Sequence, residues 1–171
     1  MALMLLRHTR PAIEDGVCYG RMDLDIAETF EDEASTIMNQ LPPIDAVVSS
    51  PLQRCLKLAC RIGVVRGLHV IADERIIEMD FGKWEGQSWA DIPKLELEQW
   101  SKDFLHARPH GGESVAMLRE RTLDALKDRE RSDASILVVT HAGVIKSAVS
   151  DGDDADAFNM SIGFGEMLTL G

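Results

Sequence analysis

The chain has 171 residues, 45% of them hydrophobic and 27% charged, which predicts one globular domain over residues 1–171 with a full hydrophobic core. Its 18 basic and 29 acidic side chains give a net charge of −11, which argues against nucleic acid and anionic membrane surfaces as partners. No apolar run is long enough to span a bilayer, no secretory leader is recognisable, and three cysteines without a CxxC pair favour a reducing cytoplasm.

The N-terminal half alternates between strand-like and helix-like segments, which predicts a layered α/β fold. In chain order, its predicted elements are a buried strand at 3–6, a long loop at 9–27, a helix at 28–40, a buried strand at 45–50, a helix after it and a short strand at 68–73. Ser50 is expected to cap the second helix, with Pro51 at its first position. A loop as long as 9–27 is uncommon in a compact domain unless it has a function.

The C-terminal half continues the alternation. Its predicted elements are an ordered loop at 75–89, helices at 94–105 and 113–130, a strand at 134–140, a helix from Gly143, an acidic loop at 151–156 and a final strand at about 159–170. The spacing of apolar residues predicts that the buried face of the helix 113–130 contains Val115, Leu118, Leu123 and Leu126. The helix dipole alone explains Glu113 near the start of that helix.

Polar side chains follow the predicted strands at the point where each strand ends. Arg7 and His8 come directly after the first strand, His141 follows the strand at 134–140, and Arg54 comes one helical turn after the second. In open α/β sheets, ligands bind beyond the carboxyl ends of the strands, so these four side chains are expected to converge. Two guanidiniums and two imidazoles at a helix start suit a tetrahedral dianion such as a phosphoryl group.

A metal site is the other interpretation of His8 and His141. It would need a third ligand, and nearby arginines would repel the cation, so the sequence favours an anion site with no metal. The remaining histidines are expected to be ordinary capping or hydrogen-bonded residues: His69, His106 and His110.

Five sequence blocks, in this order along the chain, resemble the histidine phosphatase superfamily, which includes the cofactor-dependent phosphoglycerate mutases. The blocks are LLRHT at 5–9, VVSSPLQR at 47–54, EMDFGKWEG at 78–86, GGES at 111–114 and VVTHAGVIK at 138–146. The resemblance implies a three-layer α/β/α sandwich with a mostly parallel central sheet. The loop GVCYGRMDLDI at 16–26 and the threonine of RHT resemble α-ribazole-phosphate phosphatases of cobalamin synthesis.

The resemblance also implies a covalent mechanism on a small phosphorylated substrate, with no metal or diffusible cofactor. His8 would be the nucleophile that forms a phosphohistidine, and Glu78 would be the general acid and then the base. Because the nucleophile must be neutral, activity should fall as His8 protonates, unless titration of Glu78 dominates. The other implied roles are phosphate binding by Arg7, Arg54 and His141, with transition-state stabilisation also by His141, and contact with the substrate by Gly20 and Arg21.

Other parts of the same blocks are expected to be structural: Glu85 as a structural carboxylate, and Gly111 and Gly112 as a turn into the helix. Glu14 stands near the place where relatives often carry a phosphate-contacting asparagine. Only a short segment follows His141, which would leave the pocket more open. These last two features keep a non-catalytic phosphate-binding or regulatory protein as an alternative.

Two enzymatic alternatives also stand beside the phosphatase. They are a phosphoglycerate mutase and a broad sugar-phosphate phosphatase, and the chain lacks the inserted segments that a mutase needs to hold its bisphosphate. The sequence thus favours hydrolysis over transfer.

Overall fold

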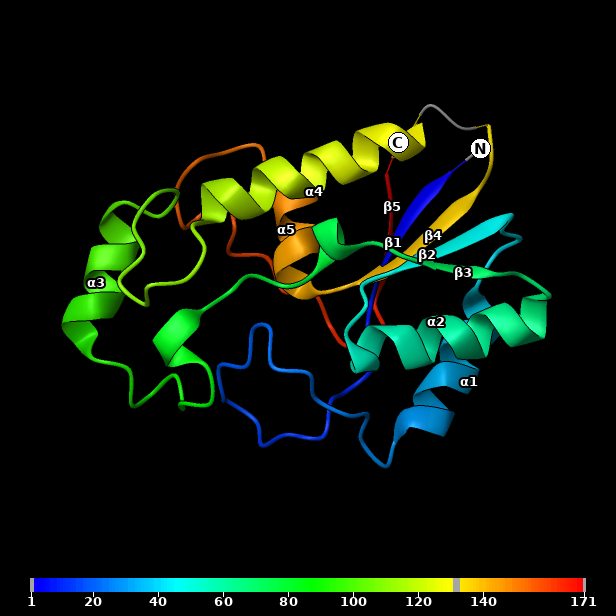
Figure 1. Ribbon diagram of the computed structural model, residues 1–171, viewed down its shortest axis with the longest axis horizontal. Helices are drawn as coiled ribbons and strands as arrows, with labels where there is room; N and C mark the ends of the chain where they lie inside the picture. Colours follow the sequence, from blue (N-terminus) through cyan, green and yellow to red (C-terminus); the bar gives the residue numbers. More distant parts are fainter. Residues whose placement is uncertain (1, 131–132, 171) are drawn as a thin grey trace.

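The computed structural model describes residues 2–130 and 133–170, which form an α/β sandwich around a mixed sheet of order β3-β2-β4-β1-β5 (Figure 1). The pairs β1–β4, β4–β2 and β2–β3 are parallel, and only β5 runs antiparallel, against β1. The strands are β1 (Leu3–Arg7), β2 (Ala46–Ser49), β3 (Val70–Ala72), β4 (Ile136–Thr140) and β5 (Met167–Leu170). The predicted mostly parallel sheet is confirmed.

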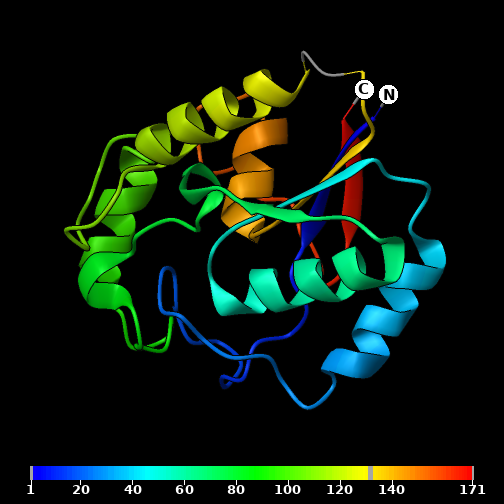
Figure 2. The same ribbon diagram turned by 45° about the vertical axis from the view of Figure 1, so that its right-hand side comes forward.

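Helices cover both faces of this sheet, as Figures 1 and 2 show. α1 and α2 lie on one face, α4 and α5 lie on the other, and α3 stands at the side of the molecule. The helices are α1 (Phe30–Gln40), α2 (Gln53–Arg66), α3 (Lys94–Lys102), α4 (Val115–Glu130) and α5 (Ala142–Val149), with 3₁₀ turns η1 (Glu74–Ile76) and η2 (Gly82–Trp84). The three-layer arrangement is therefore confirmed, and none of the helices described is long and apolar enough to cross a membrane.

The core lies in two layers, one on each face of the sheet. Along β1, Leu3 and Leu5 pack with the layer under α4 and α5, whereas Met4 and Leu6 pack with the layer under α1 and α2. Successive side chains of a strand point to opposite faces, so a strand covered on both sides is apolar throughout. This explains why the short run LMLL predicts a buried strand, and why β1 holds whatever follows it rigidly.

The start of α2 differs from the prediction. The helix begins at Gln53, not at Pro51, and Ser50 does not cap it with its side chain. The carboxylate of Asp23, from the long N-terminal loop, accepts a hydrogen bond from the Gln53 N–H at 2.7 Å. The Ser50 hydroxyl lies 2.8 Å from His141 Nε2. A contact from elsewhere in the chain thus satisfies the helix start, and the serine contacts a functional side chain.

The predicted ends of several other elements also shift. α3 ends at Lys102 rather than at 105, α4 begins at Val115 rather than at 113, and the final strand covers only residues 167–170. The segment before that strand folds over the end of β1, where the Gly165 N–H contacts the carbonyls of Arg7 and His8 at 3.2 Å each. The chain after α5 therefore covers this edge of the sheet.

One predicted core position on α4 is wrong. Leu118 is 2% exposed, but Leu123 is 46% exposed because it lies on the side of α4 that faces away from the sheet. Replacing Leu118 by alanine should lower the free energy of unfolding by about 2–5 kcal/mol, since a buried cavity is left behind. Leu123→Ala, the matched control on the same helix, should cost less than about 1 kcal/mol. Urea denaturation measures both, and equal losses would contradict this assignment of the core.

Candidate active site

Three neighbouring parallel strands end at one edge of the sheet, and polar side chains gather there. Arg7 of β1 stands opposite Thr140 of β4, so His8 and His141 follow at the same level. Their ring centroids lie 5.2 Å apart. Arg54, at the start of α2, is close enough to act electrostatically on both imidazoles. The structure thus brings the four side chains together, and Arg54 and both histidines are at most 1% exposed.

His8 is held as a neutral imidazole with one defined tautomer. Its Nδ1 lies 2.7 Å from the carbonyl oxygen of Thr9, which can only accept, so Nδ1 carries the proton. The lone pair is therefore on Nε2. Burial, and next the charge of Arg54, lower the pKa of His8 from 6.5 to about 3, against the opposing effect of the Thr9 contact. A neutral imidazole with a free Nε2 is the form that can act as a nucleophile.

His141 is the N-cap residue of α5 and is completely buried. Its Nε2 lies 2.8 Å from the Ser50 hydroxyl and 3.5 Å from the Cys55 sulfur. Burial, followed by the charge of Arg54, holds the pKa of His141 well below its usual range. Because Ser50 can orient this ring, the serine is a site residue that sequence reasoning assigned to a helix cap.

The two arginines contact backbone carbonyls yet keep free donors. Arg54 donates to the carbonyls of Met22 and Gly20, both at 2.6 Å, and Arg7 donates to the carbonyl of Ile162 at 2.5 Å. Within the part of the chain described, the Nε–H of each arginine is buried and has no hydrogen-bond partner. Buried donors are usually paired, and two unpaired guanidinium donors near two histidines are suited to an anion.

Glu78 lies on the irregular segment after η1, with its carboxylate at the start of α5. One oxygen accepts from the Met79 N–H at 2.9 Å, and the other accepts from the Gly143 N–H at 3.1 Å. A side chain at position 143 would bring its Cβ to 2.2 Å from a Glu78 oxygen, so the carboxylate can sit here only because Gly143 has none. The helix start holds the carboxylate in one place.

A cavity of about 340 Å³ adjoins this centre at Arg7, whereas His8, Arg54 and His141 are not among the residues that line it. Its charged lining residues are Arg7, Glu78 and Lys146, and Gly20 also lines it. Its apolar wall comes from four separate segments and is formed largely by aromatic side chains: Phe81, Trp89, Trp100, Phe104 and Phe158. Sequence reasoning missed this wall and Lys146, because no local spacing links residues so far apart in the chain.

The two residues expected on the substrate loop are placed differently. Gly20 lines the cavity, and its positive φ of 40° and a clash of an added Cβ at 2.3 Å with Glu85 both require glycine. Arg21 points away towards other loops: its Nε lies 3.3 Å from the Glu78 carbonyl and its Nη2 lies 3.5 Å from Glu113. Glu85 accepts from the Arg21 N–H at 2.9 Å, in keeping with its predicted structural role.

The segment after His141 covers the site instead of leaving it open. The ring of Phe164 lies 5.7 Å from that of His8 and 3.9 Å from the guanidinium carbon of Arg7. Glu14 is exposed and lines a separate pocket of about 250 Å³ with Arg7 and Phe164. The acidic side chain is therefore outside the cavity that contains Glu78.

Comparison with known proteins decides the family. The family profile described as "Histidine phosphatase superfamily (branch 1)" matches residues 3–161. The chain belongs to the histidine phosphatase superfamily. It is a metal-independent phosphatase, a hydrolase of that class.

Relatives of this histidine phosphatase carry phosphatase names. Phosphoserine phosphatase 1 of Hydrogenobacter thermophilus is 31% identical over 151 residues, which cover 81% of this chain and 70% of that protein. A glucosyl-3-phosphoglycerate phosphatase of Mycolicibacterium vanbaalenii is 28% identical over 160 residues, which cover 84% of this chain and 70% of that protein. The solved mycobacterial glucosyl-3-phosphoglycerate phosphatase in complex with VO3 has a TM-score of 0.86 at 26% identity, covering 99% of this chain and 92% of that one.

A metal site at His8 and His141 would need a third ligand close to the two imidazoles. In residues 2–130 and 133–170, no three histidine, cysteine or acidic side chains gather in a way that could hold a metal ion. The histidine pair instead adjoins the two guanidiniums, as an anion site requires.

The two buried histidines of this histidine phosphatase predict acid sensitivity of the fold. Each has a lower pKa in the folded chain than in the unfolded one. Between the unfolded value of 6.5 and the folded value of about 3 for His8, only the unfolded chain takes up the proton, so stability should fall as the pH falls. Thermal unfolding at about pH 7.5 and about pH 5 should show this loss, and His8→Asn should reduce it. An undiminished loss in that variant would contradict the burial argument.

The lowered pKa of His8 also has a consequence for the pH dependence of activity. Because His8 stays neutral down to about pH 3, protonation of His8 should not limit activity near neutral pH. Any acid limb of the rate in that range belongs to another group.

Proposed function

We propose that this histidine phosphatase hydrolyses a small phosphate monoester through a phosphohistidine formed on His8. The observation that carries the proposal is the state of that imidazole: neutral, with its lone pair on Nε2, near two guanidiniums whose buried Nε–H groups have no partner among the residues that the structure describes. A nucleophile beside free anion-binding donors is what phosphoryl transfer needs, since its catalysis is mostly positioning and charge stabilisation.

The reaction proceeds in two displacements. In the first, His8 Nε2 forms a bond to phosphorus, the bond to the leaving oxygen breaks, and protonated Glu78 gives its proton to that oxygen. In the second, ionised Glu78 takes a proton from water, the hydroxide oxygen bonds to phosphorus, and the P–N bond breaks to release inorganic phosphate. Arg7, Arg54 and His141 stabilise the charge on the phosphoryl oxygens in both steps.

The lining of the cavity supports α-ribazole 5′-phosphate as the substrate. This ester joins the phosphate to a ribose that carries a flat aromatic base. The cavity is lined by the charged side chains of Arg7 and Glu78 and by aromatic side chains that include Trp89 and Trp100. Aromatic side chains bind flat rings well. The resemblance of the loop 16–26 to α-ribazole-phosphate phosphatases points the same way.

A carboxylate-bearing phosphate ester is the second candidate. Lys146 lines the cavity and is partly buried, so it could pair with a substrate carboxylate. Relatives named for phosphoserine and glucosyl-3-phosphoglycerate, whose substrates carry such a group, favour this alternative.

A panel of phosphate esters with released inorganic phosphate as the readout tests the proposal. We expect turnover of p-nitrophenyl phosphate in the presence of a chelator, and the highest kcat/KM for α-ribazole 5′-phosphate. Trp100→Ala should raise the KM for that substrate about tenfold, equivalent to about 1.4 kcal/mol, and leave phosphoserine unaffected. Lys146→Met should raise the KM for phosphoserine and leave α-ribazole 5′-phosphate unaffected.

Other outcomes identify the alternatives. Preference for phosphoserine, lost in Lys146→Met, would replace the α-ribazole assignment by the carboxylate one. Interconversion of phosphoglycerates would favour the mutase. Phosphate binding without any turnover would favour a regulatory protein.

We also propose that the protein works in the cytoplasm. Cys18, Cys55 and Cys60 are all free thiols, which suits a reducing compartment. Fractionation of the source cells, with activity recovered outside the cytoplasm, would overturn this.

A further inference from the structure

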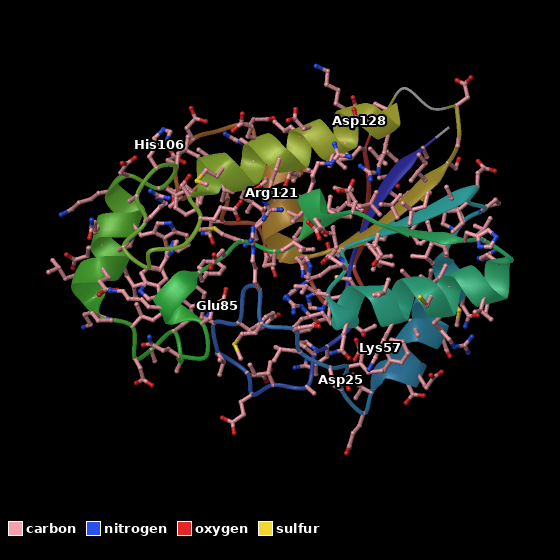
Figure 3. All side chains as sticks on the ribbon, viewed as in Figure 1. Asp25, Lys57, Glu85, His106, Arg121 and Asp128 are labelled. Carbon is pink, nitrogen blue, oxygen red and sulfur yellow. The ribbon has the colours of Figure 1, made fainter. Side chains whose placement is uncertain are left out.

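Arg121 reaches from α4 to the segment that carries Glu78, and Figure 3 shows it between that helix and η1. Its Nη1 donates to the carbonyls of Arg75 at 2.7 Å and Ile77 at 2.6 Å, and its Nη2 donates to the carbonyl of Glu78 at 3.2 Å. Its Nε and Nη2 form a fork on the Glu113 carboxylate at 2.7 and 2.9 Å. All five N–H groups of the guanidinium are thus engaged.

The segment that receives these bonds has no regular structure to hold it. Residues 77–81 belong to no helix and no strand. Backbone carbonyls in the interior need partners, and here Arg121 supplies them in place of a sheet ladder, with the Arg21 Nε as a second donor 3.3 Å from the Glu78 carbonyl. The position of the Glu78 backbone therefore depends on Arg121.

Glu113 contacts the backbone of Asp80, on the C-terminal side of Glu78. Its own N–H donates to the Asp80 carbonyl at 2.8 Å, and its carboxylate lies 3.3 Å from the Asp80 N–H. Gly112 allows this approach, since a Cβ there would lie 2.1 Å from the Asp80 carbonyl oxygen. The carboxylate is 7% exposed, so pairing with Arg121 offsets its burial. The pair thus fixes the chain both before and after Glu78.

We propose that Arg121, with Glu113, is the positioning residue for Glu78 in the reaction. This inference rests on the proposed function, in which Glu78 protonates the leaving oxygen. A general acid must reach that oxygen at about 2.6–3.2 Å, and a misplacement of about 1 Å can cost about 100-fold in rate. The Gly143 N–H orients the carboxylate from α5, and Arg121 fixes its backbone from α4, which packs against α5.

Leaving groups separate positioning of the acid from a general loss of stability. p-Nitrophenolate is a stable anion that departs with little need of a proton, whereas an alkoxide does not. A misplaced Glu78 should therefore slow an alkyl phosphate much more than p-nitrophenyl phosphate. Loss of folded protein would slow both equally.

The experiment measures kcat/KM for glycerol 2-phosphate and p-nitrophenyl phosphate in wild type and in Arg121→Met. We expect the ratio of the two values to fall about 100-fold, as it should in Glu78→Gln. Arg129→Met is the matched control: Arg129 lies on the same helix, is similarly buried and pairs with Asp73, but does not touch residues 77–81. Its ratio should equal that of wild type.

An unchanged ratio in Arg121→Met, or an equal change in Arg129→Met, would overturn the inference. If Arg121→Met does not fold, Arg121→Lys and Glu113→Gln provide the same ratio, and both should lower it. Absence of turnover in wild type would overturn the proposed function instead, so the two failures are distinguishable.

Discussion

Replacing His8 with alanine is expected to abolish turnover of every phosphate ester that the protein accepts, by a factor of about 10⁴ or more. The imidazole Nε2 is the atom proposed to bond to phosphorus, and the Thr9 carbonyl fixes the tautomer that leaves its lone pair available. Measurement of kcat for p-nitrophenyl phosphate tests this directly. His106→Ala is the control, because His106 is exposed and lies at the edge of the molecule (Figure 3), so its loss should change nothing.

The same variant should still bind inorganic phosphate, because Arg7 and Arg54 remain. Isothermal titration with phosphate therefore shows whether the site has survived the substitution. Activity of folded His8→Ala within about tenfold of wild type would exclude His8 as the nucleophile.

Arg54→Met should lower kcat/KM about 1000-fold, the second largest effect expected. Arginine groups that stabilise a transferred phosphoryl group are worth about 10³-fold or more. Arg54 is completely buried and donates to the carbonyls of Gly20 and Met22, and its Nε–H has no partner within residues 2–130 and 133–170. Arg61→Met is the control on the same helix, since Arg61 is partly exposed and forms an ion pair with Glu31 at 3.5 Å.

Lysine at position 54 distinguishes the charge from the shape of the guanidinium. Arg54→Lys keeps the charge but lacks the planar fork, so its kcat/KM should fall between wild type and Arg54→Met. A loss in Arg54→Met no larger than in Arg61→Met would show that Arg54 does not bind the phosphoryl group.

The parts of the site predicted from sequence depend on local pattern and one topological rule. Buried strands are recognisable as apolar runs, and the carboxyl ends of parallel neighbours must meet at one edge. Arg7, His8 and His141 follow such strands directly, so their meeting is a consequence of strand order. The five sequence blocks added the family, which the profile match over residues 3–161 confirms.

The errors arise where a residue outside the local helix or strand pattern supplies a partner. Asp23 satisfies the start of α2, so the Ser50 hydroxyl is available to His141. Glu113 sits two residues before α4 and pairs with Arg121, so the helix dipole alone does not explain it, contrary to the prediction. Neither contact has a signature in local spacing. Asp23 and Gln53 lie 30 residues apart, and Glu113 and Arg121 lie 8 residues apart, beyond the three- or four-residue spacing of neighbours on a helix.

The aromatic wall of the cavity could not be predicted for the same reason. Phe81, Trp100 and Phe158 come from three separate segments, and none of them lies in a pattern that indicates a ligand. Isolated aromatic residues in a sequence more often fill a core than line a site. The substrate class therefore depends on the fold, whereas the reaction class could be inferred from the strand ends.

Trapping the covalent intermediate is the most direct measurement of the central claim. Wild-type protein is mixed with p-nitrophenyl phosphate, quenched within the first turnover and digested under neutral conditions that preserve phosphohistidine. Mass spectrometry should then find one phosphoryl group on the peptide that contains His8, lost on brief acid treatment and absent from His8→Ala. Steady turnover with no adduct on that peptide, or an adduct that persists in His8→Ala, would contradict the mechanism.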